Sequence, residues 1–418
     1  MNFAVLPGRA PVVVVRPRRA SLGHQVLEFL MGIHLARALG GAVVFALDEA
    51  PVNSAVFALD CLDAEILRGA AARSALAAER RARRWRSWRE WPAARRAAVD
   101  RTVLDWLGGL AARYPPARAW RKQFKGHMGR FAAAAGRSAP DFRGLDFRAC
   151  YAGEPLRFRL PADLQERADD TAAGFGISPA APLATLHVRE SGFKQGHEAA
   201  VDALRNARID DYRALCDRLV EQGYTIARVG DAAMSPFAHP GVVDVATSPA
   251  RSDHLELALL MRSAIFVACD SGPYVTSYLT GVPCLAANVT NVLGGYPLHG
   301  SDRYLLKHPV ERATGRRLSV CEMLSADYFV HRKDLDRYAF EDNTSAELVQ
   351  GVDELLDLVS GRASGTTREQ DVVHQLASAL YDSPLVAAGR TRKGEPAHQL
   401  LGHGRLGAAF AARFLDRG

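Results

Sequence analysis

The sequence lacks any apolar run of the roughly 18–20 residues that a membrane-spanning helix needs. The apolar stretch near its N-terminus is also too short for the core of a secretory signal peptide. Its six cysteines are scattered and contain no CxxC pair, a distribution that disfavours disulfides and zinc sites. We therefore expect a cytoplasmic protein with reduced thiols.

Several nucleotide-binding and catalytic motifs are missing as well. No GxGxxG follows the first predicted strand, and neither GxxxxGK[ST] nor GxSxG occurs, which excludes the fingerprints of dehydrogenases, P-loop kinases and α/β-hydrolases. A metal-using transferase would need an acidic DxD pair at a strand end. The acidic pairs Asp169-Asp170 and Asp210-Asp211 instead fall at predicted helix starts or in surface loops. The sequence therefore predicts neither a metal site nor a cofactor.

The chain is long enough for two domains. Its 418 residues are 48% hydrophobic and 24% charged, an ordinary composition for a globular protein. The net charge of +7 is uneven, because the first 150 residues are basic and the remainder is acidic. A basic half indicates either an anionic partner or simply arginine-rich helices in water.

The N-terminal region begins with a βαβ pattern. Val12–Val15 predicts a buried strand, helical spacing starts at Gln25, and Ala42–Leu47 predicts the next strand. Doubly wound sheets bind ligands at the carboxyl edge of such strands. The loop at this edge carries Arg18, Arg19, Ser21, Gly23 and His24. His24 could act as a base, donate to a substrate, or only hydrogen-bond its own loop.

Residues 55–135 are rich in Ala and Arg and poor in β-branched residues, which predicts helices. Trp85, Trp88 and Trp91 recur every third position among arginines. This pattern favours an amphipathic helix with packed tryptophans and solvated arginines over a membrane-interfacial helix or a nucleic-acid surface. No nucleic-acid-binding motif supports the last alternative.

The second half of the chain alternates strands and helices, the pattern of a parallel α/β domain. The predicted strands are Leu183–Val188, Thr225–Val229, Val242–Ala246 and Ile265–Cys269. The predicted helices are Ala162–Ala173, a segment starting near Ile209, His254–Arg262 and Ser345–Val359.

The last of these strands runs directly into Asp270-Ser271-Gly272-Pro273. Ser271 or Gly272 can cap a helix, Pro273 suits its first turn, and Gly281 can end it. A helix start at a strand's carboxyl end directs amide groups and a positive dipole end at the crevice, which favours phosphate or diphosphate. The alternative is an ordinary βα turn with nothing bound.

Arg189 follows the Leu183–Val188 strand and can grip phosphate in a planar, bidentate manner. Together with the Ser271-Gly272 amides it would form a diphosphate clamp that needs no metal. Glu190 or His24 could supply a base. Arg189 could equally form an ion pair with Glu190 or Asp231, and Asp270 could serve only to order its own turn.

Four segments carry a family resemblance through their order and spacing: HVR at His187–Arg189, RN-x-x-ID-x-Y at Arg205–Tyr212, RVG at Arg228–Gly230 and DSG at Asp270–Gly272. They resemble a group of bacterial glycosyltransferases of GT-B type that is distantly similar to fucosyltransferases. The likeness is strongest over residues 183–300. Ser21–His24 is similar to that group's N-terminal glycine-rich loop, and Leu401–Phe414 is similar to its C-terminal end.

The resemblance implies an α/β, GT-B-like fold with two doubly wound Rossmann-type domains facing a cleft. It assigns acceptor binding to an N-terminal domain over 1–165 with a helical insertion, and nucleotide-sugar binding to a domain over 166–362. A helical tail over 363–418 follows, for which packing against the N-terminal domain is one option. It also implies a metal-independent, inverting transfer of a hexose or deoxyhexose from a nucleoside-diphosphate sugar to a hydroxyl or amine.

The expected catalytic residues are Arg189, Glu190 and His24. The expected donor-binding residues are His187, Arg189, Lys194, Arg205, Arg228, Gly230, Asp231, Asp270, Ser271, Gly272 and Pro273. The expected acceptor-side residues are Arg19, Ser21, Gly23 and His24. Fucosyltransferases carry an acidic residue soon after HxR, where this chain has Ser191-Gly192, so GDP-fucose is not implied as the donor.

The sequence leaves the acceptor open among a small molecule, a lipid-linked glycan and a protein, and it leaves peripheral membrane contact open. Two other functions also remain. One is a GT-B-shaped nucleotide-sugar epimerase, which would need no acceptor. The other is a non-catalytic protein that binds nucleotides or nucleic acid through its basic half.

Overall fold

The computed structural model describes residues 2–6, 12–17, 21–38, 40–47, 49–60, 64–73, 76, 156–191, 203–294, 297–386 and 401–415. The chain forms two compact units. The first comprises Met1–Pro17, Met31–Ala50 and Asp63–Leu145, and the second comprises Arg18–Leu30, Pro51–Leu62 and Asp146–Gly418. The tryptophan-rich segment, Arg18, Arg19 and Lys194 lie outside the described residues. Within the described residues, no helix is long and apolar enough to cross a membrane.

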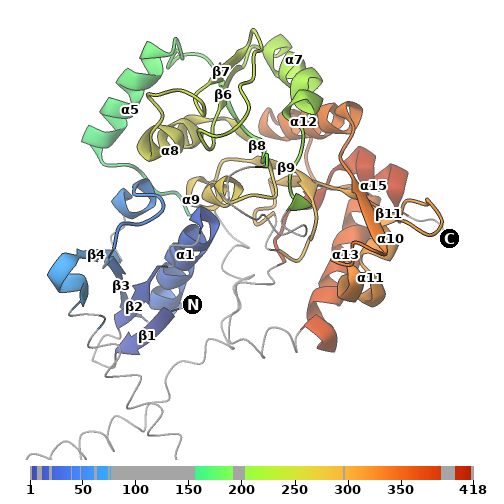
Figure 1. Ribbon diagram of the computed structural model, residues 1–418, viewed down its shortest axis with the longest axis horizontal. Helices are drawn as coiled ribbons and strands as arrows, with labels where there is room; N and C mark the ends of the chain where they lie inside the picture. Colours follow the sequence, from blue (N-terminus) through green and yellow to red (C-terminus); the bar gives the residue numbers. More distant parts are fainter. Residues whose placement is uncertain are drawn as a thin grey trace, which may run out of the picture. The chain divides into compact units, whose positions relative to one another are not determined.

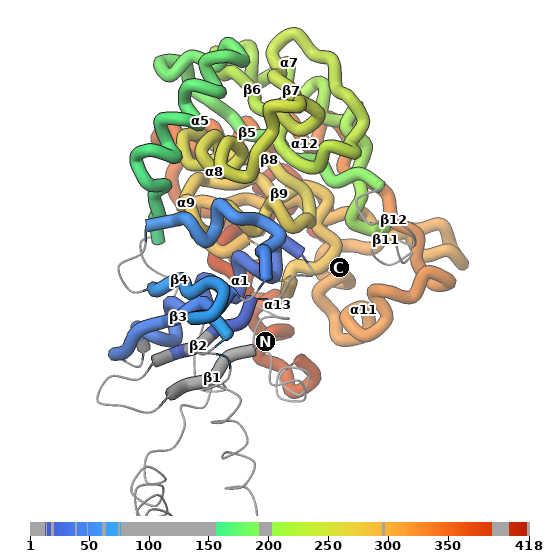
Figure 2. Tube along the Cα trace, turned by 60° about the vertical axis from the view of Figure 1, so that its left-hand side comes forward, coloured from blue at the N-terminus to red at the C-terminus, as the bar shows by residue number. Residues whose placement is uncertain are grey.

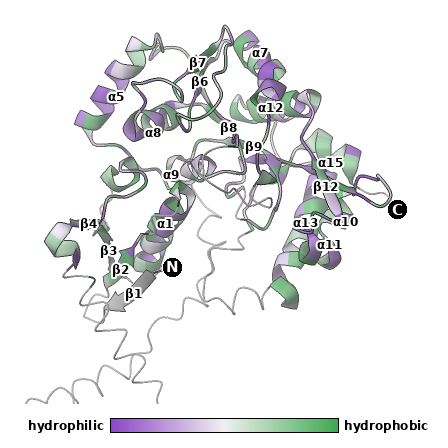
Figure 3. Ribbon diagram, in the orientation of Figure 1, coloured by the Kyte–Doolittle hydropathy of each residue, from purple (hydrophilic) through white to green (hydrophobic). Residues whose placement is uncertain are grey.

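The first unit contains a four-stranded sheet in the order β1-β2-β3-β4. Its strands are β1 (Asn2–Leu6), β2 (Val12–Arg16), β3 (Ala42–Leu47) and β4 (Ala64–Arg68). β1 runs antiparallel to β2, and the other neighbours are parallel. β3 is almost entirely apolar, as its colouring in Figure 3 shows, and the second half of α1 (Leu22–Ala38) packs against β2 and β3. A Cβ on Gly32 of α1 would lie within 3.0–3.2 Å of side chains on both strands.

β4 corrects the prediction that the chain is helical from residue 55 onward. Residues 64–68 form a strand that pairs in parallel with β3. Its residues are partly exposed, as expected at the edge of a sheet, so the sequence AEILR lacks the apolar run of a central strand. The pairing partner offered by β3 outweighs the helical preference of Ala, Glu and Leu.

The second unit is built on a seven-stranded parallel sheet in the order β13-β10-β9-β8-β5-β6-β7 (Figure 1). Its strands are β5 (Leu183–His187), β6 (Thr225–Arg228), β7 (Val242–Asp244), β8 (Ile265–Cys269), β9 (Cys284–Val289), β10 (Arg303–Leu306) and β13 (Arg405–Leu406). Every neighbouring pair is parallel. The predicted α/β fold with parallel sheets is therefore confirmed.

Helices cover both sides of this sheet. α5 (Ala162–Gly174) packs beside α8 (Asp253–Arg262), and α7 (Arg213–Glu221) packs beside α12 (Ser345–Val359). Figures 1 and 2 show the two pairs on opposite sides of the central strands. Because the central strands β5, β8 and β9 are covered on both faces, all their residues are buried.

The remaining elements are short or lie after β10. They are η1 (Ala55–Ala58), η4 (Ile209–Tyr212), η5 (Pro273–Thr276), α9 (Ser277–Thr280), β11 (His308–Glu311), α10 (Val320–Met323), α11 (Ala326–His331), β12 (Tyr338–Glu341), α13 (Arg368–Asp382) and α15 (Ala408–Phe414). β11 and β12 form an antiparallel pair. In the predicted helical tail, α13 and α15 are separated by β13, which joins the edge of the large sheet beside β10.

Candidate functional site

A cavity of about 390 Å³ opens at the carboxyl ends of β5, β6 and β8, entirely within the second unit. Its walls come from these strand ends and the segments that follow them, from the start of α1, the loop before η1, the segment before η4, the first turn of η5 and the start of α8. The lining residues are Ser21, Leu22, Gly23, His24, Leu27, Val52, Asn53, His187, Arg189, Glu190, Ser191, Arg205, Gly230, Asp231, Ala233, Met234, Arg251, Asp253, Glu256, Ser271, Gly272, Pro273 and Val275.

Most of the residues singled out in the sequence meet in this cavity. Those that line it are Ser21, Gly23, His24, His187, Arg189, Glu190, Arg205, Gly230, Asp231, Ser271, Gly272 and Pro273. Asp270 lies next to the cavity in sequence without lining it, and Arg228 lies outside it. Arg19 and Lys194 belong to the undescribed residues. Segments more than 200 residues apart in sequence therefore contribute to one site.

The turn after β8, Asp270–Pro273, is called the Asp-Ser-Gly corner below. It has the predicted capping chemistry, but the helix that follows begins as a 3-10 helix and not as an α-helix. Gly272 is the N-cap, Pro273 occupies the first turn, and Ser271 Oγ accepts a 3.3 Å hydrogen bond from the Tyr274 N–H. The helix starts as the 3-10 element η5 and continues as the single turn α9. It ends at Gly281, whose φ of +65° is left-handed, as expected for a glycine at this position.

The main chain of Arg189 is held beside this corner from both sides. Its N–H donates a 2.8 Å hydrogen bond to Cys269 Sγ, and its carbonyl accepts a 2.9 Å bond from the Ala207 N–H. Burial raises the pKa of the Cys269 thiol to about 12, so the thiol stays neutral. The Arg189 residue is only 8% exposed and lines the cavity together with Ser271 and Gly272.

Asp270 orders the corner. One carboxylate oxygen accepts a 2.8 Å hydrogen bond from Thr290 Oγ1, and the other lies 3.9 Å from the Arg205 guanidinium. Asp270 is buried, whereas the Arg205 side chain is about one-third exposed and faces the cavity. Asp270 therefore links the loop after β9 to a cationic side chain of the cavity wall.

The structure changes the prediction for the N-terminal loop, because α1 begins at Leu22 and not at Gln25. Ser21 is the residue before the helix, and its Oγ lies 2.6 Å from His24 Nδ1 and 3.4 Å from the His24 main-chain N. The first turn of a 17-residue helix, with the positive end of its dipole, thus contributes Leu22, Gly23 and His24 to the cavity.

Two glycines let the start of α1 approach the Asp-Ser-Gly corner. A Cβ on Gly23 would lie 3.3 Å from Gly272 Cα, and a Cβ on Gly272 would lie 3.3 Å from Gly23 N. Such distances are tighter than ordinary carbon contacts, so side chains at either position would push the two segments apart. The start of α1 and the Asp-Ser-Gly corner therefore lie side by side in the cavity wall.

His187 is buried and neutral. Burial lowers the pKa of its imidazole to about 4, helped by the nearby guanidiniums and opposed by the 3.0 Å hydrogen bond between Nδ1 and the Val229 carbonyl. With the proton on Nδ1, Nε2 is left as an acceptor, and it has no protein partner in the described structure. His187 is thus suited to accept a hydrogen bond, not to supply positive charge.

The sequence prediction missed Arg251 and Glu256. Arg251 Nε donates to the Gly230 carbonyl at 2.5 Å and to Glu256 Oε1 at 2.9 Å, and the same oxygen accepts from the Gly230 N–H at 3.0 Å. Burial raises the pKa of the Glu256 carboxyl to about 7, against the lowering effect of Arg251. The N-cap Ser252 could have indicated the helix start that brings both side chains here.

Arg228 differs most from its predicted role as a donor-binding residue. Its side chain is completely buried, and it pairs with the carboxylates of Asp244 at 2.9 Å and Glu190 at 3.4 Å. It cannot reach a ligand in the cavity, because internal partners occupy its guanidinium and no part of it is exposed. Glu190 does line the cavity, with a side chain that is 13% exposed.

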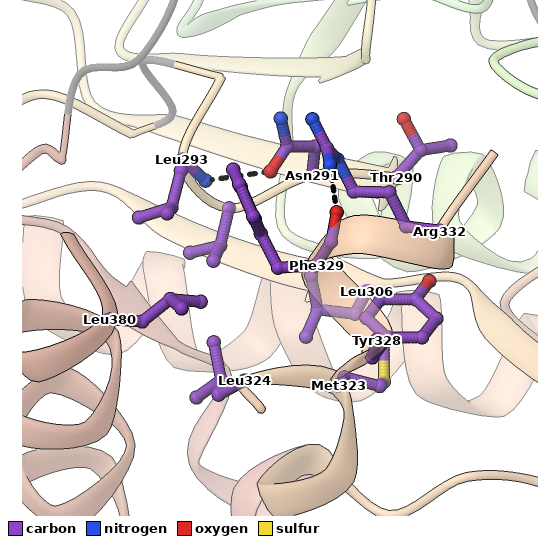
Figure 4. Close-up of a pocket in the computed structure, with 11 residues that line it drawn as sticks. Thr290, Asn291, Leu293, Leu306, Met323, Leu324, Tyr328, Phe329, Arg332 and Leu380 are labelled. Carbon is purple, nitrogen blue, oxygen red and sulfur yellow. Dashed lines mark hydrogen bonds between the residues drawn. The ribbon is translucent and has the colours of Figure 1, made fainter. Parts of the chain in front are cut away.

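A second, much smaller hollow of about 10 Å³ lies beside β9 and β10 (Figure 4). It has room for roughly one water molecule. Its lining is largely apolar, Arg332 donates to the Phe329 carbonyl, and Asn291 Oδ1 accepts a 3.1 Å hydrogen bond from Leu293 N. None of the residues predicted from the sequence lines it.

The described part of the chain contains no group of three or more His, Cys, Asp or Glu side chains placed to hold a metal ion. Among the described residues, the cationic side chains that line the large cavity are those of Arg189, Arg205 and Arg251. The cavity therefore combines arginines and the start of α1, which suit an anion, with the four carboxylates of Glu190, Asp231, Asp253 and Glu256.

No protein-family model and no curated protein matches the chain. Among solved structures, it is similar to a glycosyl transferase family 9 protein from Veillonella parvula DSM 2008. The TM-score is 0.42 and the sequence identity 10%, over 82% of this chain and 96% of that chain. A likeness of this degree does not define the activity of the present chain. The residues of the cavity are the basis for the function proposed below.

Proposed function

We propose that the protein is a glycosyltransferase that moves a sugar from a nucleoside-diphosphate sugar to a hydroxyl or amine acceptor. One observation supports this most directly. Arg189, the Ser271-Gly272 corner and the first turn of α1 line a single cavity at the carboxyl edge of a parallel sheet. That edge is where open α/β sheets bind nucleotides.

The chemistry of the leaving group accounts for these residues. Breaking the bond between sugar and diphosphate leaves negative charge on the diphosphate oxygens. A guanidinium and oriented amide groups stabilise that charge as it grows in the transition state. We propose that Arg189 carries the cationic part of this task and that transfer needs no metal.

We propose His24 as the base that accepts the proton of the attacking hydroxyl or amine. Ser21 Oγ, 2.6 Å from Nδ1, fixes the imidazole ring, and His24 lines the cavity on the α1 side. A base must lie within hydrogen-bond reach of the acceptor atom, so the acceptor would occupy this side of the cavity. Leu27 and Val52 line the same side and would contact the body of the acceptor.

A hexose or deoxyhexose donor and an inverting course stay predictions from the sequence, as do the cytoplasmic location and the domain limits at residues 165 and 362. A reaction of the donor alone, giving an epimer without any acceptor, would point instead to an epimerase.

The test begins with thermal unfolding in the presence of GDP, UDP, TDP and ADP. At a ligand concentration 100 times the Kd, binding adds about 2.7 kcal/mol to the free energy of unfolding. We expect one diphosphate to raise the Tm well above the others. The nucleotide sugar of that base is then the donor to use in transfer assays.

Arg189→Ala should remove the diphosphate-induced rise in Tm and slow transfer by about 10²–10³-fold, because the main cation of the clamp is lost. Arg167→Ala is the matched control, since this arginine is exposed on α5 and pairs with Asp163 at 3.1 Å. It should leave both properties unchanged. Turnover of Arg189→Ala near that of the wild type would refute the proposed function.

A further inference from the structure

The cavity rim formed by residues 231–237 is held by side chains from three neighbouring strand ends. Arg228 ends β6, Asp244 ends β7, and Glu190 follows β5. Arg228 Nη1 donates to the Ser235 carbonyl at 2.7 Å and to Asp244 Oδ2 at 2.9 Å, and Nη2 lies 3.4 Å from Glu190 Oε2. The guanidinium therefore joins the rim to both carboxylates.

The two carboxylates bind the same rim through its amide groups. Glu190 Oε2 accepts a 2.7 Å hydrogen bond from the Ser235 N–H, and Asp244 Oδ2 accepts a 3.0 Å bond from the Phe237 N–H. Ser235 is thus fixed at its carbonyl by Arg228 and at its N–H by Glu190. Charged side chains thus satisfy both the N–H and the carbonyl of Ser235, which restrains the rim at this residue.

This rim carries part of the cavity wall. Asp231, Ala233 and Met234 line the cavity, and they precede Ser235 directly. The Asp231 carboxylate accepts a 2.8 Å hydrogen bond from the Ala233 N–H, which makes a tight turn between them. Fixing Ser235 and Phe237 therefore also fixes the three side chains that face a ligand.

We propose that Glu190, Arg228 and Asp244 are a positioning network that holds the rim in the conformation that binds the nucleotide donor, and that Glu190 is not the base. This inference rests on the proposed function. Glu190 Oε2 accepts hydrogen bonds from both the Ser235 N–H and the Arg228 guanidinium. Its hydrogen bonds are directed at the rim, which is the geometry of a support and not of a group that takes a proton from an acceptor.

Glu190→Gln distinguishes a residue that supports the rim from a catalytic base. The substitution keeps the size of the side chain and an oxygen for the Ser235 N–H, but removes the charge that attracts Arg228. Loss of one charge-assisted contact should raise the KM for the donor about tenfold, while kcat at saturating donor changes less than about threefold. A catalytic base would give the opposite split, with kcat lowered by about 10²–10⁴-fold at unchanged donor KM, and that result would overturn the inference.

Glu221→Gln is the matched control. Glu221 also forms an Arg–Glu pair with a 3.4 Å N–O distance, to Arg218, but on the exposed surface of α7. It should change neither kinetic constant. Asp244→Asn provides a second test within the network and should shift the donor KM in the same direction as Glu190→Gln. An unchanged donor KM in both network variants would contradict the proposal.

Hydrogen exchange makes the inference testable even if the proposed function fails. In the ligand-free protein, Glu190→Gln should speed exchange of the Ser235 and Phe237 amides, and Glu221→Gln should not. If no nucleoside diphosphate shifts the Tm of the wild type, the proposed function falls, but faster exchange would still establish the network. Unchanged exchange at both amides would show that the carboxylate does not hold the rim.

Discussion

At the scale of single residues, Gly230 shows how tightly the cavity is built. Its φ of +147° is a conformation that residues with a Cβ rarely adopt. A Cβ there would also collide with Met234 Sδ and approach His187 Nδ1 to 2.9 Å. The glycine thus allows the rim and the strand-end histidine to meet.

Replacing Gly230 by Ala should destabilise the protein by about 2–4 kcal/mol, because backbone strain and overpacking act together. Chemical denaturation measures this change. Gly174→Ala at the end of α5 is the control, since a Cβ there meets nothing within 4 Å. A double variant that adds Met234→Ala should recover only part of the loss, because the strain in φ remains. Wild-type stability in Gly230→Ala would show that the rim is free to move.

Two arginines at strand ends of the second unit have different surroundings. Arg189 and Arg228 both follow or end strands of the same sheet, and both looked in the sequence like anion-binding groups. The first lines the cavity, while the second is buried between two carboxylates. The two carboxylates that hold Arg228 in the interior lie 16 and 38 residues away from it in the chain.

At the scale of elements, a buried pair connects the start of β11 to α12. His308 Nε2 lies 3.1 Å from Glu347 Oε2, and both side chains are 3% exposed. Glu347 also completes the capping box of α12 with Thr344. The His308 ring stacks on Phe410 and meets Phe414 edge-on, so α15 covers the pair.

This pair predicts a specific dependence of stability on pH. Although burial opposes it, hydrogen bonds from His308 and Thr344 hold the pKa of the Glu347 carboxyl below its usual value. A carboxyl with a lowered pKa in the folded state contributes stability above the unfolded pKa, and that contribution is lost as the pH falls through the folded pKa.

His308→Gln should therefore lower the free energy of unfolding by about 1–3 kcal/mol at pH 7, since the buried hydrogen bond to the Glu347 carboxylate is disrupted. The same variant should lose less stability than the wild type between pH 5 and pH 3, a range set by the ordinary glutamate pKa. Urea denaturation at the three pH values measures both effects. Arg167→Gln, which breaks an exposed pair, should change neither the stability at pH 7 nor its dependence on pH. Parallel pH curves for His308→Gln and the wild type would contradict this.

At the scale of the whole molecule, the last described segment belongs to the core of the second unit. β13 extends the sheet beside β10, and α15 packs on α12 and α13. Glu354 of α12 accepts hydrogen bonds from Arg303 Nε at 2.5 Å, Gln370 Nε2 at 2.8 Å and the Ala408 N–H at 2.6 Å. One carboxylate thus joins β10, α13 and α15.

A chain ended after residue 400 should lose these contacts and the apolar cover of His308. We expect its Tm to fall by more than about 5 °C, because the lost burial amounts to several kcal/mol in a protein of this size. Thermal unfolding followed by circular dichroism measures the change. A chain ended after residue 415 keeps β13 and α15 and serves as the control, with an unchanged Tm. Equal Tm values for both would show that the tail is dispensable to the core.

The elements that the sequence predicted well are those with a local cause. β8 and α12 have the predicted limits, because an apolar run buried on both faces and a capped amphipathic pattern are visible in consecutive residues. β4 and β13 were not predicted, because each is an edge strand held mainly by pairing with a strand elsewhere in the chain. The start of α1 was placed three residues late, because Gly23 obscures its first turn.

Residues close together in the chain were enough to predict the parallel α/β fold of the second unit and the capping chemistry of the Asp-Ser-Gly corner. The folded chain was needed to show that His24 and Arg189 share a cavity, that Arg251 and Glu256 complete it, and that Arg228 is buried. These features depend on which distant strand ends become neighbours, because those neighbours set burial and charge pairing. No local pattern of residues encodes those distances.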